Sequence, residues 1–281
     1  MSARMTKFEG AGEGPGLPVV SGARGLLLTV LGEFVLPSGG AAQSSALVAA
    51  LGSLGVEPGT ARQVMARSAA RGWLVREKVG ARTRWHLTEH ARRLLAEGTE
   101  RIYGFGRRRP GWDGRWLLLV VSVPERHRSL RYRLRTRLTW AGFGALGQGV
   151  WLCPYVEREG MAVGVVKSLG LEGATSFLGS FGQLGDVGRL VAEAWNLGAL
   201  GRRYHAFCAW ADSLAPRGDE ESFAAQARLV HEWRQFPLLD PELPRTLLPD
   251  DWEGDQALAR FHRLHEQWRP AAWKWWGRLA R

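Results

Sequence analysis

Apolar side chains in the first third of the chain recur at helical spacing in three successive segments. The first predicted helix covers 23–36 and ends at a turn that begins with Pro37. The second begins at Ser44 or Ser45, either of which offers a hydroxyl N-cap. A third helix is predicted from an N-cap at Thr60 to Gly72, a glycine just past its end.

The third predicted helix has an apolar side and a polar side. The apolar side is formed by Ala61, Val64, Met65 and Ala69, and the polar side by Arg62, Gln63, Ala66 and Arg67. After the helix, the apolar residues 73–75 predict a strand, Gly80-Ala81 predicts a turn, and 82–87 predicts a returning strand in which Trp85 and Leu87 alternate with polar residues. Helix, helix, turn, helix and hairpin, in that order, predict a winged helix-turn-helix domain over 22–98.

The residue types on this domain suit contacts with DNA. The third helix is expected to enter the major groove, where arginine pairs with guanine, glutamine with adenine, and an alanine methyl with thymine. The hairpin is expected to approach the DNA backbone or the minor groove. The predicted DNA-binding residues are Thr60, Arg62, Gln63, Ala66, Arg67, Lys78, Arg82 and Arg84. Two other interpretations remain. Any small three-helix domain has helices with an apolar and a polar side, and winged helices also bind proteins.

The pattern changes after a turn-rich linker predicted at 99–114. Residues 116–123 form an apolar run typical of a buried strand, and further elements are predicted at 125–141 (helix), 149–153 (strand), 157–169 (helix) and 174–180 (strand). This alternation predicts a ferredoxin-like α+β domain over 115–187. Helical spacing over 188–281, broken by a proline-rich stretch at 236–249, predicts a helical C-terminal domain. The fold class is therefore α+β and multidomain, preceded by a flexible tail at 1–21.

The excess of basic residues is concentrated in the first half of the chain. The 281-residue chain carries 38 Lys and Arg against 27 Asp and Glu, and 62–93 alone holds nine basic and two acidic residues. Residues 101–140 hold eleven basic and two acidic ones, whereas the region from 188 onward is balanced at thirteen each. A localised basic surface is typical of nucleic-acid binding, although a solvated face without a partner remains an alternative. Four interpretations of the arginine-rich helix at 126–137 remain. The helix contacts DNA phosphates, the phosphates of a small ligand or an acidic domain surface, or it faces solvent.

No pattern supports catalysis, a metal or a cofactor. Two cysteines, Cys153 and Cys208, are too few for a disulfide framework or a cysteine-based zinc site. The glycine motif at 142–147 follows a helix and precedes a strand, which is the reverse of a dinucleotide-binding context. His262 and His265 are expected to be surface residues. Without a signal peptide or a run of about 18 apolar residues, we expect a cytoplasmic protein with no membrane contact.

Several stretches together resemble one family. They are 28–37 (LTVLGEFVLP), 62–73 (RQVMARSAARGW), 101–106 (RIYGFG), 112–116 (WDGRW), 143–151 (FGALGQGVW), 194–197 (AWNL) and 236–252 (FPLLDPELPRTLLPDDW). In this order the chain resembles the PaaX family, bacterial repressors of phenylacetate degradation. The resemblance implies winged-helix, ferredoxin-like and helical domains, a homodimer, and release from operator DNA by an aromatic acyl-CoA such as phenylacetyl-CoA.

The sequence departs from the family pattern in the third helix, where Ala66 replaces a serine and Ser68 a leucine. This puts the operator sequence in doubt. The central region also resembles a small CRISPR-associated nuclease, but 120–124 lacks the aspartate that ends the first strand there. A ligand-responsive transcriptional regulator is therefore the leading hypothesis. The alternatives are a nucleic-acid-processing enzyme and a non-specific architectural binder.

Overall fold

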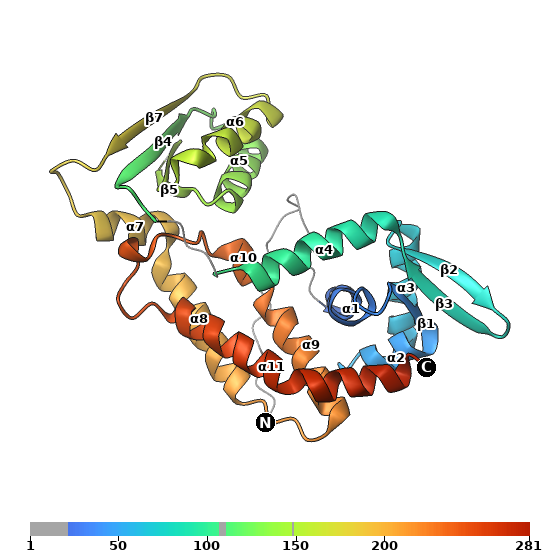
Figure 1. Cartoon of the computed structure of the whole chain (residues 1–281). Coiled ribbons are helices and arrows are strands. Elements are labelled where there is room, and N and C mark those ends of the chain that lie inside the picture. The colour runs from blue at the N-terminus through green and yellow to red at the C-terminus, as the bar shows by residue number, and fades with distance from the viewer. Residues whose placement is uncertain (1–21, 107–110, 148) are drawn as a thin grey trace.

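The computed structural model describes residues 22–106, 111–147 and 149–281 (Figure 1). The tail expected at 1–21 and part of the expected linker lie outside the described residues. Figure 1 shows an N-terminal unit with a projecting β2–β3 hairpin, a central α/β unit, and C-terminal helices that run beneath both. The fold is a mixed α/β one with a helical C-terminal region.

The N-terminal unit packs four α-helices against a small antiparallel sheet with strand order β1-β3-β2. Its elements are α1 (Gly22–Val30), the π-helix η1 (Leu31–Val35), β1 (Ala41–Gln43), α2 (Ser44–Ser53), α3 (Pro58–Ala70), β2 (Leu74–Val79), β3 (Arg82–Leu87) and α4 (Glu89–Gly104). The three predicted helices and the hairpin are confirmed as elements. The short strand β1, which pairs with β3, was not predicted.

Both predicted N-caps in this unit are wrong. Gln43 occupies the N-cap position of α2, without a side-chain capping bond, because it ends β1 and strand pairing with Arg84 holds it extended. Helix α3 begins at Pro58, since the fixed φ of proline suits the first helical position, so Thr60 lies inside the first turn.

Helix α4 crosses the boundary predicted at 98. Thr88 caps it by accepting a hydrogen bond from the Ala91 amide at 3.1 Å. The same hydroxyl donates to the Gly72 carbonyl at 2.7 Å, which ties the start of α4 to the end of α3. The helix continues to Gly104, so the first residues of the expected linker are helical.

The central unit has a four-stranded antiparallel sheet with strand order β5-β6-β4-β7. Its elements are β4 (Arg115–Val121), α5 (Arg128–Trp140), β5 (Gly144–Gly147), β6 (Val150–Cys153), the 3-10 helix η2 (Val156–Arg158), α6 (Glu159–Ser168) and β7 (Ala174–Ser180). The sequence predicted three strands and missed β5. Helices α5 and α6 cover one face of the sheet, where Leu117, Leu119 and Val121 pack against Leu134 and Leu138.

The C-terminal region is helical, as predicted. Its elements are α7 (Val187–Trp195), α8 (Leu197–Asp212), α9 (Asp219–Trp233), α10 (Phe236–Leu239), the 3-10 helix η3 (Arg245–Leu247) and α11 (Glu253–Leu279). Helix α11 has 27 residues and continues through Pro270. In Figure 1 it crosses in front of α8 and runs to the N-terminal unit, where its end lies beside α2.

The C-terminal helices complete the core of the N-terminal unit. Phe34 of η1 packs against Phe223 of α9, with ring centroids 4.5 Å apart, and against Trp276 of α11 at 5.9 Å. The Trp276 indole N–H donates to the Ser38 hydroxyl at 3.0 Å. Trp268 and Trp276 of α11 are buried and pack in the core.

Among the described residues, no helix combines the length and the apolar content needed to cross a bilayer.

Candidate nucleic-acid interface

The outward side of α3 carries the predicted polar stripe. Arg62, Gln63, Ala66 and Arg67 are all exposed, whereas Ala61 and Met65 on the opposite side are buried in the core. The end of the helix is fixed by Gly72, whose φ of +73° is favourable only for glycine. The amides of Gly72 and Trp73 bond back to the carbonyls of Ala69 and Ser68 at 2.9 Å each, which is a Schellman motif.

The start of α3 is also open to solvent. Pro58, Gly59 and Thr60 are exposed, and no side chain caps the helix. The first-turn amides of a helix lack intrahelical partners and carry the positive end of its dipole. Thr60 therefore places a hydroxyl at an end of the helix that is suited to anions.

The β2–β3 hairpin presents its basic residues on two different faces. Lys78 pairs across with Thr83, and Arg82 with Val79, so strand alternation places Lys78 on one face and Arg82 with Arg84 on the other. The two-residue turn begins with Gly80, whose φ of +59° is favoured by glycine. The structure therefore does not gather the three predicted hairpin residues on one face.

Sequence reasoning missed one basic residue of the hairpin. Arg76 lies two positions before Lys78, on the same face, and its Nη2 donates to the Thr83 hydroxyl at 3.4 Å. The signal was available, since residues two apart in a strand share a face. The opposite face is less basic, because Glu77 lies opposite Arg84 and forms an ion pair with His86 at 2.6 Å.

The predicted basic residues are not neutralised by ion pairs with other described residues. In the described part of the chain, Arg62, Arg67, Lys78, Arg82 and Arg84 form no ion pair within 4.0 Å. Arg67 donates only to the neutral Gln63 amide oxygen, at 3.3 Å. This surface can therefore attract phosphate without first breaking an internal salt bridge.

A buried polar cluster holds the N-terminal unit against the C-terminal helices. Glu33 of η1 accepts hydrogen bonds from the Tyr103 hydroxyl at 2.5 Å and from the Gln226 amide at 2.7 Å. His265 Nε2 lies 2.7 Å from the same carboxylate. Burial and the negative charge of Glu33 raise the pKa of the Tyr103 phenol far above its usual value, so the phenol remains a donor.

The prediction that His265 is a surface residue is wrong, because its side chain is only 12% exposed. The cluster joins residues up to 232 positions apart, which no local pattern reveals. The described residues contain no group of three or more side chains arranged to hold a metal ion.

The glycines of the 142–147 motif have structural roles. A Cβ on Gly142 would lie 1.8 Å from Arg158 Nη1, and one on Gly144 would lie 2.6 Å from the Trp195 ring. These glycines permit close packing between β5, α6 and α7. Cys153 is buried in the core, and burial raises the pKa of its thiol to about 11.

Comparisons with known proteins agree over most of the described chain. Three family models match in sequence: "PaaX-like protein" at 22–91, "PaaX protein central Cas2-like domain" at 109–188, and "PaaX-like protein C-terminal domain" at 195–278. The transcriptional repressor PaaX of Escherichia coli is 27% identical over 261 residues, covering 88% of this chain and 80% of its own length.

A solved structure has a similar fold. It is the uncharacterized protein Rv0674 from Mycobacterium tuberculosis, 24% identical, with a TM-score of 0.61 over 89% of this chain and 96% of its own. With all three regions matched in order, the chain belongs to the PaaX family.

Proposed function

We propose that this chain is a transcriptional repressor that binds operator DNA through its N-terminal unit, used as a winged helix-turn-helix domain. The observation that carries the proposal is the exposed face of α3, where Arg62 and Arg67 have no carboxylate partner among the described residues. The similarity to a named transcriptional repressor supports it independently. The protein acts by binding rather than by catalysis, in the cytoplasm where the DNA lies.

Helix α3 lies in the major groove in this proposal. Arg62, Gln63 and Arg67 read base edges, and Ala66 contacts a thymine methyl. Thr60 meets a phosphate at the start of the helix. On the hairpin, Lys78 lies on the face that also carries Arg76, and Arg82 and Arg84 lie on the other. The hairpin therefore follows the DNA backbone or minor groove with one of these pairs nearest to it.

The finer parts of the proposal come from the family. The repressor is a homodimer on an inverted repeat, and it controls an operon for catabolism of an aromatic acid of the phenylacetate type. An aromatic acyl-CoA, such as phenylacetyl-CoA, releases the repressor from the operator. The order βαββαβ with a β5-β6-β4-β7 sheet supports a ferredoxin-like central domain.

Selection of genomic fragments tests the proposal. Purified full-length protein is mixed with fragmented genomic DNA at about 0.15 M salt with excess competitor, and retained DNA is sequenced. We expect one or a few promoter fragments that share an inverted repeat. Uniform, salt-sensitive recovery of all fragments would instead indicate a non-specific architectural binder.

A matched pair of variants tests the residues. Arg67→Ala is expected to weaken operator binding by about 1–3 kcal/mol, because a bidentate base contact is lost. Arg263→Ala removes an exposed arginine from α11 and is expected to leave affinity unchanged. Equal affinities for Arg67→Ala and wild type, with intact folding, would remove Arg67 from the interface.

A further inference from the structure

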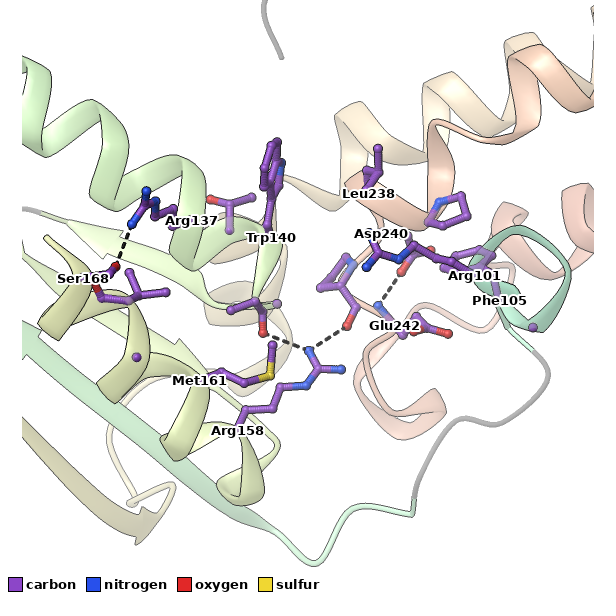
Figure 2. Close-up of a pocket in the computed structure, with 18 residues that line it drawn as sticks. Arg101, Phe105, Arg137, Trp140, Arg158, Met161, Ser168, Leu238, Asp240 and Glu242 are labelled. Carbon is purple, nitrogen blue, oxygen red and sulfur yellow. Dashed lines mark hydrogen bonds between the residues drawn. The ribbon is translucent and has the colours of Figure 1, made fainter. Parts of the chain in front are cut away.

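Helix α5 of the central unit is rich in arginine, and the proposed DNA contacts do not use it. Its thirteen residues, Arg128–Trp140, include five arginines and no acidic residue. The end of α5 shares a cavity with the end of α4, where Figure 2 shows Arg137 and Trp140 together with Arg101. The opposite end of α4 is tied to α3 through Thr88, and its sixteen residues span about 24 Å at 1.5 Å each. The arginines of α5 therefore belong to a different part of the molecule from the exposed face of α3 (Figure 1).

Three of these arginines and a tyrosine share one side of the helix. Residues three, four and seven positions apart along an α-helix lie on the same side. Here they are Arg128, Arg131, Tyr132 and Arg135, which we call the α5 surface. Arg137 lies on another side of the helix, where its Nη1 donates to the Ser168 hydroxyl of α6 at 2.6 Å (Figure 2). Arg137 thus serves the contact between the two helices, and the α5 surface does not.

The α5 surface has a net positive charge. Arg128 and Arg135 are exposed and form no hydrogen bond or ion pair with the described residues. Arg131 is held in place, because its Nη2 donates to the Glu125 carbonyl at 2.9 Å and its Nη1 lies 4.0 Å from the Glu125 carboxylate. The Glu125 side chain is 85% exposed, so solvent screens much of its charge. One such carboxylate against three guanidinium groups leaves the surface attractive to phosphate.

Tyr132 lies among these arginines with its ring open to solvent. The residue is 57% exposed, and no ring or guanidinium of the described residues stacks on it. A tyrosine usually buries its apolar ring and leaves only the hydroxyl in water. An exposed tyrosine ring therefore offers a flat surface to another planar group.

A hollow of about 590 Å³ lies beside the α5 surface. Arg131, Tyr132 and Arg135 line it from the helix, and Val121 and Trp151 line it from the sheet. Its volume is within the range of roughly 300–1,000 Å³ found for small-molecule sites, so a nucleobase fits inside it. The tyrosine and two of the arginines thus border one space.

We propose that the α5 surface binds single-stranded nucleic acid. A base stacks on Tyr132, and the arginines hold the phosphates on either side of this base. Proteins that bind single strands combine these two features, a basic surface along the backbone and an aromatic ring for a base. Arg128 and Arg135 are seven residues apart, about 10 Å along the helix axis, which allows each to contact a different phosphate.

A duplex would use the α5 surface less well. Its bases are paired and stacked on one another, so they cannot stack on a tyrosine that lies on the outside of a helix. The arginines alone would contact a duplex, through its phosphates. Single-stranded DNA and RNA share the chemistry recognised here, because both offer unstacked bases and phosphates. The site is additional to the proposed operator interface and does not depend on it.

Fluorescence anisotropy of labelled oligonucleotides tests the proposal with the full-length protein. The probes are oligothymidylate and oligouridylate of about 12 nucleotides, and a duplex of mixed sequence, at about 0.1 M salt. Tyr132→Leu is expected to raise Kd for the single strands at least fivefold, since one stacked base is lost. The double variant Arg128→Gln/Arg135→Gln is expected to raise this Kd at least tenfold, since two phosphate contacts are lost. Both variants should change Kd for the duplex less than twofold.

The same helix supplies two matched controls. Tyr132→Phe keeps the aromatic ring and should bind the single strands with a Kd within twofold of wild type. Arg133→Gln removes an exposed arginine that lies outside the α5 surface, and its Kd should also stay within twofold. Thermal unfolding checks that each variant is folded.

Each outcome decides one question. A loss of binding with oligothymidylate alone assigns the surface to single-stranded DNA, a loss with oligouridylate alone assigns it to RNA, and an equal loss assigns it to both. Wild-type Kd values in Tyr132→Leu or in the double variant overturn the proposal. No binding of either single strand, or an equal loss of single-strand and duplex binding, also overturns it. Operator selection is measured separately, so its failure beside intact single-strand binding refutes only the repressor function.

Discussion

His231 should make the packing of α9 on α1 sensitive to acid. Its Nδ1 lies 3.1 Å from Thr29 Oγ1, and this hydroxyl already donates to the Gly25 carbonyl at 3.1 Å. The hydroxyl oxygen can therefore accept an N–H from a neutral imidazole. Burial and the positive charge of Arg234 lower the pKa of His231 from its usual 6.5 to about 3.

The magnitude follows from this difference in pKa. Between pH 6.5 and pH 3 the unfolded chain protonates His231 and the folded chain does not, so acid favours unfolding. The free energy of unfolding then falls by about 1.4 kcal/mol for each pH unit. Between pH 7 and pH 4 this group removes about 3 kcal/mol, against a typical total of roughly 5–15 kcal/mol.

Urea unfolding at pH 7, 6, 5 and 4, followed by tryptophan fluorescence, tests this reasoning. His231→Asn keeps an N–H donor for Thr29 but does not titrate. Its difference in stability from wild type should shift by about 3 kcal/mol in favour of the variant between pH 7 and pH 4. A constant difference for His231→Asn would refute the proposed effect of burial.

Further substitutions probe a buried hydrogen bond, a core tryptophan and a helix cap. Tyr103→Phe removes a donor to the buried Glu33 carboxylate, so urea unfolding at pH 7 should show a loss of about 1.5–3 kcal/mol. Because its pKa is raised, Tyr103 should also make wild type, but not this variant, lose stability as pH rises above 10. Trp276→Ala should cost about 3–5 kcal/mol in the same assay, since it empties a core position and removes the hydrogen bond that the indole donates to Ser38; a loss below 1 kcal/mol would contradict the shared core. Thr88→Ala should lower the thermal midpoint through a loss of about 1 kcal/mol, and Thr88→Ser should restore most of it.

Local patterns predicted the elements that carry strong local signals. The polar and apolar sides of α3 and the glycine after it were visible in the sequence, because helical spacing and positive φ are encoded within a few residues. The strand β5 was missed since Gly144 and Gly147 have low strand propensity. The Trp195 ring, 51 positions later, occupies the space that a side chain at position 144 would need, which accounts for Gly144.

The sequence predicted which side of α3 is exposed. It did not predict that the basic residues of the hairpin lie on two different faces. The strand pairing that separates Lys78 from Arg82 follows from a two-residue turn and could have been worked out from alternation. The partnership of Glu33 with His265 could not, because it depends on how α11 crosses the N-terminal unit. The DNA contacts themselves stay predictions.

The placement of α11 also constrains how the protein is made. Trp275 and Trp276 belong to the same core as Phe34, yet they are synthesised long after it, once the whole central unit has been made. At roughly 5–20 residues per second, the first helices wait on the order of tens of seconds for these partners. A chain truncated before Trp275 would therefore have N-terminal helices that expose apolar surface, even though every residue of α3 and the hairpin is present. The N-terminal unit can complete its core only after α11 has been made.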